Sequence, residues 1–379
     1  MSTEAVAASM LSRAARAGAR GLGRVEPNPA VGCVLARGDA VLAIARHARY
    51  GGPHAEAAAI ARCRTLGIDM RGATAYVTLE PCAHTGRTPP CAEALIGAGV
   101  DRVVFARADP NPIAQGGAAR LRGAGIEAEC SSASRIATRL SDPFVKRMTT
   151  GLPWVIAKWA QTIDGRVATR ARRSKWISNE RSRRAVHRLR GRVDAILTGI
   201  GTVRDDDPML TARDVVVRRA ARRVVIDPHL ELALDSSLVR TSRDQPVCAI
   251  AADEAVLGSD RAQHLRDAGV ELRAAPALGG DGEVDLREVL SWLATSHDAT
   301  NVLIEAGPGV LSRFHDHRLI DEARVFIAPR VLGDGEAIPP LGGASLADIS
   351  DAPRWTLERV RRWGDDLELR YLTGVSVPA

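Results

Sequence analysis

Aromatic residues are scarce in this chain of 379 residues, where they make up 3% of the sequence. Proteins that bind single-stranded nucleic acid stack bases on aromatic side chains, so we expect no nucleic-acid partner despite the net charge of +7. Lysine is rare too: only Lys146, Lys158 and Lys175 occur, and arginine supplies the other positive charges. Arginine clusters such as "VVVRRAARR" therefore indicate a general arginine preference, and a few guanidinium groups suit a phosphorylated substrate.

Long apolar runs and a disulfide pattern are also missing. No stretch approaches the roughly 18 uninterrupted apolar residues of a membrane span, so we expect no membrane partner. The six cysteines lack the spacing of a disulfide framework, which favours a reducing compartment, the cytoplasm. The first residues are rich in Ala, Arg and Ser, as transit peptides are. However, Val6, Met10, Leu11 and Ala14 recur at helical spacing, which predicts a first helix instead.

Three short segments together fit a zinc site. His54, Cys82 and Cys91 offer an imidazole and two thiolates, which are three ligands for a tetrahedral Zn²⁺ whose fourth position stays open, as in catalytic sites. Glu56 follows the histidine by two residues, where zinc-dependent base deaminases carry their proton-transferring glutamate. The segment "PHAE" opens an Ala-rich helical stretch, and Pro81-Cys82 follows a β-type run. The pattern predicts hydrolytic catalysis with Glu56 as the catalytic residue.

The spacing of the cysteines departs from the general deaminase signature. That signature places two residues between its cysteines, whereas eight residues separate Cys82 from Cys91 here. The difference points to a subfamily with a longer loop.

The first half of the chain alternates strands and helices, which predicts a three-layer α/β domain with the metal ligands gathered at one edge of its sheet. The expected elements are helix 4–20, strands 31–36 and 40–45, a helix from His54, strand 73–79, a helix from about Cys91, strand Arg102–Ala106 and helix 116–124.

Pro143, Gly151 and Pro153 interrupt this alternation, so we place a boundary there and expect domains at 1–148 and 149–379. A second α/β series follows without a second zinc motif. Its expected strands lie in "WVIAKWA", "DAILTGIGTV", "RRVVID", "VCAIAA", "NVLIE", "ARVFIAP" and "DLELRYL", and its helices at 179–191, 284–295 and from Gly309.

Ordered motifs along essentially the whole chain resemble one family, the bifunctional deaminase/reductases of riboflavin biosynthesis. In the first half they are "PNPAVGCVL", "PHAE", "YVTLEPCAHTGRTPPC", "LIGAGVDRVV" and "DPNP". In the second half they are "FVKRMTTGLP", "KWAQTIDGR", "SKWIS", "LRGRVDAILTGIGTVRDDDPMLTAR", "VVID", "EAGP" and "IAPRVLG". The long cysteine loop is typical of this family.

The resemblance implies a cytidine-deaminase-like domain followed by a dihydrofolate-reductase-like domain. The first would use Zn²⁺ to replace the 2-amino group of 2,5-diamino-6-(5-phosphoribosylamino)pyrimidin-4-one with oxygen. The second would use NADPH to open and reduce the ribosyl group to ribityl. A homo-oligomer formed through the reductase domain is also expected.

In the deaminase domain, Asn28 within "PNP" is expected to contact the edge of the pyrimidine, with a simple turn asparagine as the alternative. His47, His84 and Arg87 lie in or near the same loops. They are candidates to hold the ring or the phosphate, and solvated loop residues otherwise.

In the reductase domain, the resemblance assigns two groups of residues. Those expected at NADPH are Ala160, Trp176, Thr202 and Asp206, with Gly307, Pro308 and Gly309 as a turn that offers N–H groups to a phosphate. Those expected at the substrate are Ser174, Arg190, Leu210, Arg213 and Glu305. Lys158, Asp206 and Glu305 are candidates to assist opening of the sugar ring.

Two other interpretations remain. A nucleic-acid base deaminase shares the zinc chemistry but leaves the second domain and the long cysteine loop unexplained. A structural zinc module with a nucleotide-sensing domain would need a fourth protein ligand, because structural zinc sites are closed.

Overall fold

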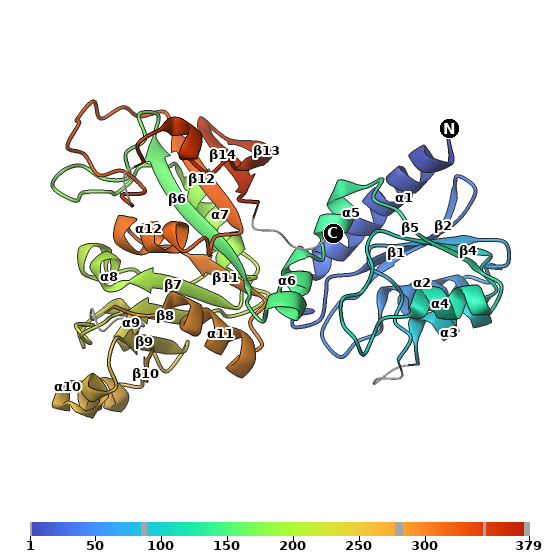
Figure 1. The fold of residues 1–379 in the computed structure, drawn as a ribbon, viewed down its shortest axis with the longest axis horizontal. Helices are drawn as coiled ribbons and strands as arrows, with labels where there is room; N and C mark the ends of the chain where they lie inside the picture. Colours follow the sequence, from blue (N-terminus) through green and yellow to red (C-terminus); the bar gives the residue numbers. More distant parts are fainter. Residues whose placement is uncertain (1, 85–88, 277–282, 344–345, 375–379) are drawn as a thin grey trace. The chain divides into compact units, whose positions relative to one another are not determined.

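The computed structural model describes residues 2–84, 89–276, 283–343 and 346–374. The chain forms two compact units, the first ending at Gly151 and the second beginning at Leu152 (Figure 1). Each unit has its own sheet. In the described residues no helix is long and apolar enough to cross a membrane.

The first unit is built on a five-stranded sheet with the order β2-β1-β3-β4-β5. Its strands are β1 (Gly32–Arg37), β2 (Ala40–Arg46), β3 (Thr74–Val77), β4 (Arg102–Phe105) and β5 (Glu127–Cys130). Its α-helices are α1 (Thr3–Gly18), α2 (Ala55–Thr65), α3 (Cys91–Ala98), α4 (Gly117–Gly123), α5 (Arg135–Arg139) and α6 (Asp142–Thr150). Strand β1 runs antiparallel to β2 and β3, whereas β3, β4 and β5 are parallel.

Side-chain alternation along β1 explains the three layers of this unit. Cys33 and Leu35 belong to one core, shared with α2, α3 and α4. Val34 and Ala36 point to the other face and share a second core with α1 and α5. Because successive residues of a strand face opposite sides, helices cover both faces of the sheet, as the sequence pattern predicted.

The second unit is built on a nine-stranded sheet with the order β10-β9-β8-β7-β11-β6-β12-β14-β13. Its strands are β6 (Trp154–Thr162), β7 (Ala195–Gly199), β8 (Arg222–Ile226), β9 (Val247–Ala251), β10 (Glu271–Ala274), β11 (Asn301–Ile304), β12 (Glu322–Ala328), β13 (Thr356–Trp363) and β14 (Asp366–Leu372). Its α-helices are α7 (Glu180–Arg190), α8 (Ile200–Asp206), α9 (Ser237–Arg240), α10 (Asp260–Asp267), α11 (Leu286–Ser296) and α12 (Pro308–Asp316).

Seven of these strands, β10 to β12 in the sheet order, are parallel, and the hairpin β13–β14 adds antiparallel strands. All residues of β7 and β9 are buried, as expected for parallel strands covered on both faces. The large core of this unit includes Phe314 of α12 and Leu293 of α11.

The sequence pattern located most elements but misjudged some boundaries. The run "DAILTGIGTV", expected as one strand, is divided between β7 and α8 at Gly199. Strands β5, β10 and β13 and helices α5, α6, α9 and α10 were not anticipated; α6 forms where Pro143 and Gly151 had indicated only an interruption, because Pro143 is tolerated in the first turn of a helix and Gly151 ends it. The strand β13 was missed because seven of its eight positions carry polar or exposed side chains, so it lacks the alternation that a strand with one buried face shows.

A buried ion network joins β12 to β14. Glu322 is 2% exposed, and its carboxylate accepts hydrogen bonds from Arg324 Nε at 2.7 Å and Arg370 Nη2 at 2.8 Å. Arg324 also donates to Glu368 Oε1 at 3.1 Å. Burial by itself would raise the pKa of Glu322, but the charges of Arg324 and Arg370 outweigh it and lower the pKa to about 2.

We predict that Glu322→Gln destabilises the second unit by about 3 kcal/mol, the lower end for breaking a buried pair, because Arg324 keeps Glu368. Urea unfolding followed by tryptophan fluorescence measures this unit selectively, since all six tryptophans lie beyond residue 152. The matched control is Glu231→Gln, which breaks the exposed pair with Arg204 and costs less than about 1 kcal/mol.

The difference between wild type and Glu322→Gln depends on pH. A carboxylate with a lowered folded-state pKa stabilises the fold above its unfolded value, and this contribution is lost as pH falls through the folded value. The difference in the free energy of unfolding between the two proteins should therefore be largest above pH 4.5 and should decrease toward pH 2. A difference that stays constant from pH 7 to pH 3 would contradict this account.

Candidate active sites

The predicted zinc ligands come together at one edge of the first sheet. His54 is the N-cap of α2, Cys91 is the first residue of α3, and Cys82 lies in the loop after β3. His54 Nδ1 lies 3.2 Å from Cys91 Sγ and 3.6 Å from Cys82 Sγ. The Cys91 N–H donates to Cys82 Sγ at 3.4 Å. The two ends of the loop between the cysteines, Cys82 and Cys91, therefore lie close together at the ligand atoms.

The geometry of this cluster fits a tetrahedral zinc ion. Its three ligand atoms all lie within 4.8 Å of one another. Zinc bonds of about 2.0–2.3 Å place neighbouring tetrahedral ligands roughly 3.3–3.8 Å apart. In the described residues this is the one group of three or more such side chains with metal-binding geometry, so no fourth protein ligand is found there.

The hydrogen bond between the two thiols shifts their pKa values in opposite directions. The hydrogen bond with Cys91 contributes most to lowering the pKa of Cys82, to about 4, against the effect of burial. The same hydrogen bond, followed by burial, raises the pKa of Cys91. His54 has a raised pKa mainly because it is hydrogen-bonded to Cys82. A divalent cation would compensate both thiolates at once.

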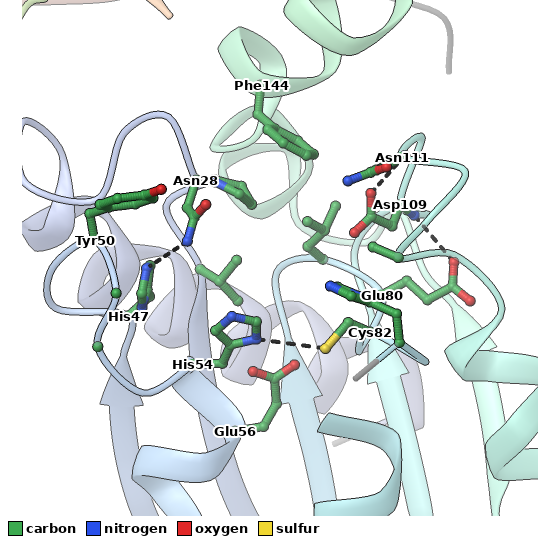
Figure 2. A pocket seen from close by; sticks show the side chains of 17 residues that line it. Asn28, His47, Tyr50, His54, Glu56, Glu80, Cys82, Asp109, Asn111 and Phe144 are labelled. Atoms are coloured by element: carbon green, nitrogen blue, oxygen red, sulfur yellow. Dashed lines mark hydrogen bonds between the residues drawn. The ribbon is translucent and has the colours of Figure 1, made fainter. Parts of the chain in front are cut away.

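Glu56 lies in the first turn of α2, directly beside the ligand cluster (Figure 2). Its side chain is buried, at 3% exposure, and burial raises its pKa to about 7. A carboxyl group in this position is within reach of a substrate above the cluster. It is held by helix geometry, because residues 54 and 56 belong to the same turn.

A cavity of about 290 Å³ opens over the cluster. Its wall includes Asn28, His47 and Tyr50 (Figure 2). Asn28 Nδ2 lies 3.3 Å from His47 Nε2, and His47 Nδ1 lies 2.9 Å from the carbonyl oxygen of Pro53. Burial lowers the pKa of His47. The structure therefore brings Asn28 and His47 into the same pocket as the predicted ligands, and His84 lines it as well. Arg87 lies outside the described residues.

Sequence reasoning missed several residues of this wall, among them Asp109, Asn111 and Phe144. Asp109 accepts a hydrogen bond from the N–H of Asn111 at 2.9 Å, and burial raises its pKa to about 6. The motif "DPNP" was the signal in the sequence that could have identified Asp109 and Asn111. Phe144 belongs to α6 and opens the motif "FVKRMTTGLP", which was expected to belong to the second half of the chain, yet its ring lines this cavity in the first unit (Figure 2).

A close backbone approach fixes the position of Cys82. A Cβ atom built on Gly117, the first residue of α4, would lie 1.6 Å from the carbonyl oxygen of Pro81. The backbone at the start of α4 therefore packs closely against the peptide bond between Pro81 and Cys82. Two backbone hydrogen bonds hold the same segment. The Ala92 N–H donates to the Cys82 carbonyl, and the Ala83 N–H donates to the Ala114 carbonyl.

In the second unit, a buried carboxylate lies between two cations. Glu305 follows β11 and is 8% exposed. Its Oε2 accepts from Lys158 Nζ of β6 at 3.3 Å, and its two oxygens accept from Arg190 of α7 at 2.5 and 3.0 Å. Burial would raise the pKa of Glu305, but the charges of Arg190 and then Lys158 lower it to about 2.

The predicted glycine turn begins helix α12. Gly307 is its N-cap and Pro308 its first residue, and no side-chain cap is found there among the described residues. The Gly307 N–H donates to Thr202 Oγ1 of α8 at 2.9 Å. A Cβ on Gly309 would meet nothing within 4 Å. The turn is thus open, and uncapped N–H groups at a helix start are suited to a phosphate.

Other predicted reductase residues form a second group around Asp206. Ser174 Oγ donates to Asp206 Oδ1 at 3.4 Å, and Lys175 Nζ donates to the Asp206 carbonyl at 2.8 Å. Trp176 is 62% exposed, with the Arg183 guanidinium 4.7 Å from its ring centroid. Asp206 thus contacts Ser174 and Lys175, whereas Lys158 pairs with Glu305.

The remaining predicted residues lie on β6 and on the loop after α8. Ala160 pairs with Phe326 across β6 and β12. Leu210 is buried, with a backbone φ of 51°. Arg213 is exposed, and its guanidinium donates to Thr211 Oγ1 at 3.1 Å. The Arg190 guanidinium reaches the same loop through the Thr211 carbonyl at 3.2 Å.

Comparison with known proteins assigns a class to each unit. Residues 6–107 match the family described as the cytidine and deoxycytidylate deaminase zinc-binding region. Residues 153–369 match the family described as the RibD C-terminal domain. Together with the sites above, these matches define a bifunctional enzyme in which a deaminase domain is followed by a reductase domain.

Full-length relatives specify the family. The riboflavin biosynthesis protein RibD of Escherichia coli is 36% identical over 96% of this chain and 98% of that protein, and that of Aquifex aeolicus is 36% identical over 92% and 93%. The chain belongs to the RibD family of riboflavin biosynthesis enzymes, whose cofactors are zinc and NADPH.

Solved structures agree along the whole chain. A deaminase/reductase of Thermotoga maritima superimposes with a TM-score of 0.82 at 32% identity, covering 98% of this chain and 100% of that one. A RibD structure of Acinetobacter baumannii gives a TM-score of 0.81 at 34% identity, covering 97% and 99%. The expected family and fold class are therefore confirmed.

We predict that Gly117→Ala weakens zinc binding roughly 10–100-fold, the range for changes behind a metal ligand, because the new methyl group displaces Pro81 and with it Cys82. Competition with a chromogenic chelator measures the affinity. Gly97→Ala is the control, since a Cβ on Gly97 of α3 meets nothing within 4 Å. Equal zinc affinity in the two variants would refute the role of this approach.

Proposed function

We propose that residues 1–148 deaminate 2,5-diamino-6-(5-phosphoribosylamino)pyrimidin-4-one, and that residues 149–379 reduce the ribosyl group of the product to ribityl. The observation that carries the proposal is the pocket over His54, Cys82 and Cys91, with the Glu56 carboxyl group beside the ligand atoms. In the second domain, the Lys158–Glu305–Arg190 cluster supports the reductive step.

In the deamination, His54, Cys82 and Cys91 would hold zinc, because the donor set of one imidazole and two thiols fits that ion. Zinc, when bound, lowers the pKa of water toward neutrality. Glu56 accepts a proton from the attacking water as the C–O bond forms at the amidine carbon. It then delivers protons to the ring nitrogen and to the amino group, which leaves as ammonia.

Asn28 orients the substrate for this attack. Its amide offers both a donor and an acceptor to the pyrimidine edge, and the bond between Asn28 Nδ2 and His47 Nε2 fixes its side chain. His47 is in turn oriented by the Pro53 carbonyl, one residue before the ligand His54.

In the reduction, the sugar ring opens by cleavage of the bond between C1′ and the ring oxygen, which takes up a proton. NADPH supplies the hydride that C1′ receives, and the attached nitrogen remains as the amine of the ribityl product. Lys158 is the proton donor near the sugar, and Glu305 holds its ammonium in place at 3.3 Å. Ser174, Arg190, Leu210, Arg213 and Glu305 form the substrate side of the site.

The cofactor side of this site has suitable groups for NADPH. The start of α12, with Gly307, Pro308 and Gly309, would hold a phosphate of the cofactor, and Thr202 Oγ1 accepts the hydrogen bond of the Gly307 N–H. Ala160, Trp176 and Asp206 complete the cofactor site.

Two further proposals concern the enzyme as a whole. A homo-oligomer forms through residues 149–379, and gel filtration of the intact chain tests it. The enzyme works in the cytoplasm, a reducing compartment consistent with six free cysteines.

We predict that Glu56→Gln retains zinc but loses deaminase turnover by about 10²–10⁴-fold, because the amide cannot accept the proton. Ammonia release from the diaminopyrimidine substrate measures this loss. NADPH oxidation should also stop with that substrate, and should be normal when the deaminated pyrimidine is supplied instead. Near-normal ammonia release would overturn the role of Glu56.

We predict that Lys158→Met lowers the reductase kcat at least about 10²-fold while ammonia release is unchanged, because methionine keeps the length of the side chain but not its proton. The assay is NADPH oxidation with the deaminated pyrimidine as substrate. An unchanged kcat would refute the proposed role of Lys158 in opening the sugar ring.

A further inference from the structure

The loop of residues 209–213 in the second unit is fixed by three basic side chains. Arg223, fully buried on β8, donates to the Met209 carbonyl at 3.1 Å. Arg190 donates to the Thr211 carbonyl at 3.2 Å. His187 of α7, three residues before Arg190 and therefore on the same helix face, contacts both Thr211 and Arg213. The loop thus depends on contacts from outside it.

The backbone of this loop needs such contacts. Leu210 is 2% exposed and has a φ of 51°, a left-handed conformation that a leucine rarely adopts. A residue in that region keeps its conformation only where its surroundings determine it. The orientation of the Arg213 side chain, three residues after Leu210, therefore depends on the hydrogen bonds made by residues 209, 211 and 213.

His187 makes two contacts with one nitrogen atom. Its Nδ1 lies 3.1 Å from the Thr211 carbonyl oxygen and 3.2 Å from the backbone nitrogen of Arg213. To bond to the carbonyl, Nδ1 must carry a proton; to accept from the Arg213 N–H, it must have a lone pair. The two bonds therefore exclude each other. Neutral His187 accepts from the Arg213 N–H as the tautomer that carries its proton on Nε2, whereas the protonated ring can only donate from Nδ1 to the carbonyl.

The surroundings of His187 favour the neutral ring. Burial, followed by the charge of Arg190, lowers its pKa, and Arg213 acts in the same direction. The Thr211 carbonyl and the Glu305 carboxylate oppose this effect. These groups lie on α7, on the loop and after β11, and together they leave the ring neutral at pH 7.

Arg190 and Arg213 are the two arginines expected at the substrate, where a guanidinium fork suits a phosphate, and they differ in their present bonds. The Arg190 guanidinium donates hydrogen bonds to both carboxylate oxygens of Glu305 and to the Thr211 carbonyl. Arg213 is exposed and bonds through Nη1 to Thr211 Oγ1. A guanidinium on the loop surface can turn toward a phosphate without leaving a buried carboxylate unpaired.

We propose that neutral His187 is a positioning residue of the reductase: its Nδ1 accepts from the Arg213 N–H and so directs the Arg213 guanidinium to the substrate phosphate. Protonation of the ring moves this bond to the Thr211 carbonyl and releases Arg213. The inference rests on the proposed function, in which Leu210 and Arg213 belong to the substrate site.

The test compares His187→Leu, His187→Asn and His264→Asn in the intact enzyme, with NADPH oxidation on the deaminated pyrimidine as the readout. His187→Leu should raise KM about fivefold at pH 7.5, the effect of one lost hydrogen bond, with kcat within about twofold. Asparagine keeps an acceptor at the position of Nδ1 and does not titrate, so His187→Asn should restore KM. His264 is exposed on α10, and its variant should match wild type. Ammonia release and tryptophan fluorescence report whether each variant is folded.

The pH dependence of KM separates positioning from packing. Between pH 8 and pH 5.5 the wild-type KM should rise more steeply than that of His187→Asn. The substrate phosphate titrates identically in both assays, so the difference between the curves belongs to His187. Superimposable curves, or an unchanged KM in His187→Leu, would overturn the inference.

Arg213→Ala distinguishes failure of this inference from failure of the proposed function. An unchanged KM in that variant would overturn the substrate role of Arg213 and the role of His187 with it, while reduction by the wild type continues. Absence of NADPH oxidation by the wild-type enzyme would instead overturn the proposed reductase function.

Discussion

Parallel strands constrain both candidate sites, because each strand that is followed by a helix delivers the helix start to the same edge of its sheet. In the first unit this edge receives His54 and Cys91 at the beginnings of α2 and α3. In the second it receives Gly307 at the beginning of α12, and Thr202 in the first turn of α8. Two unrelated chemistries therefore use the same structural feature, a helix N-terminus whose N–H groups favour anions.

Buried charges decide how each site is used. Glu305 stays ionised in a buried position because two cations face it, and removing either would leave the carboxylate partly uncompensated. For Glu56, burial outweighs the lowering effects of His54 and of a hydrogen bond with Cys91, and its pKa rises to about 7. One carboxyl group is thus fixed as an anion that orients Lys158 and Arg190. The other can gain or lose a proton during a reaction, as hydrolytic deamination requires.

The sequence predicted residues whose chemistry is local and missed those that tertiary structure brings in. His54, Glu56, Cys82 and Cys91 could be recognised because residue type and spacing carry the zinc chemistry. Phe144 could not, since nothing in α6 indicates that its ring reaches a cavity lined by the start of α2 and the loop after β3. The strand–helix junction at Gly199 was hidden because "DAILTGIGTV" mixes apolar residues with Thr and Gly on both sides of the junction, and periodicity cannot divide so short a run.

Arg190 illustrates the limit of transferring roles by residue type. A guanidinium fork suits phosphate and carboxylate equally, so sequence alone could not decide between a substrate and a protein partner. In the fold its fork lies on Glu305, and its remaining contact is a carbonyl of the neighbouring loop. Arg190 therefore joins the buried carboxylate to the loop that carries Arg213. The positions of the Glu305 carboxylate and of the loop that carries Arg213 both depend on the Arg190 side chain. These two parts of the substrate site therefore cannot be positioned independently.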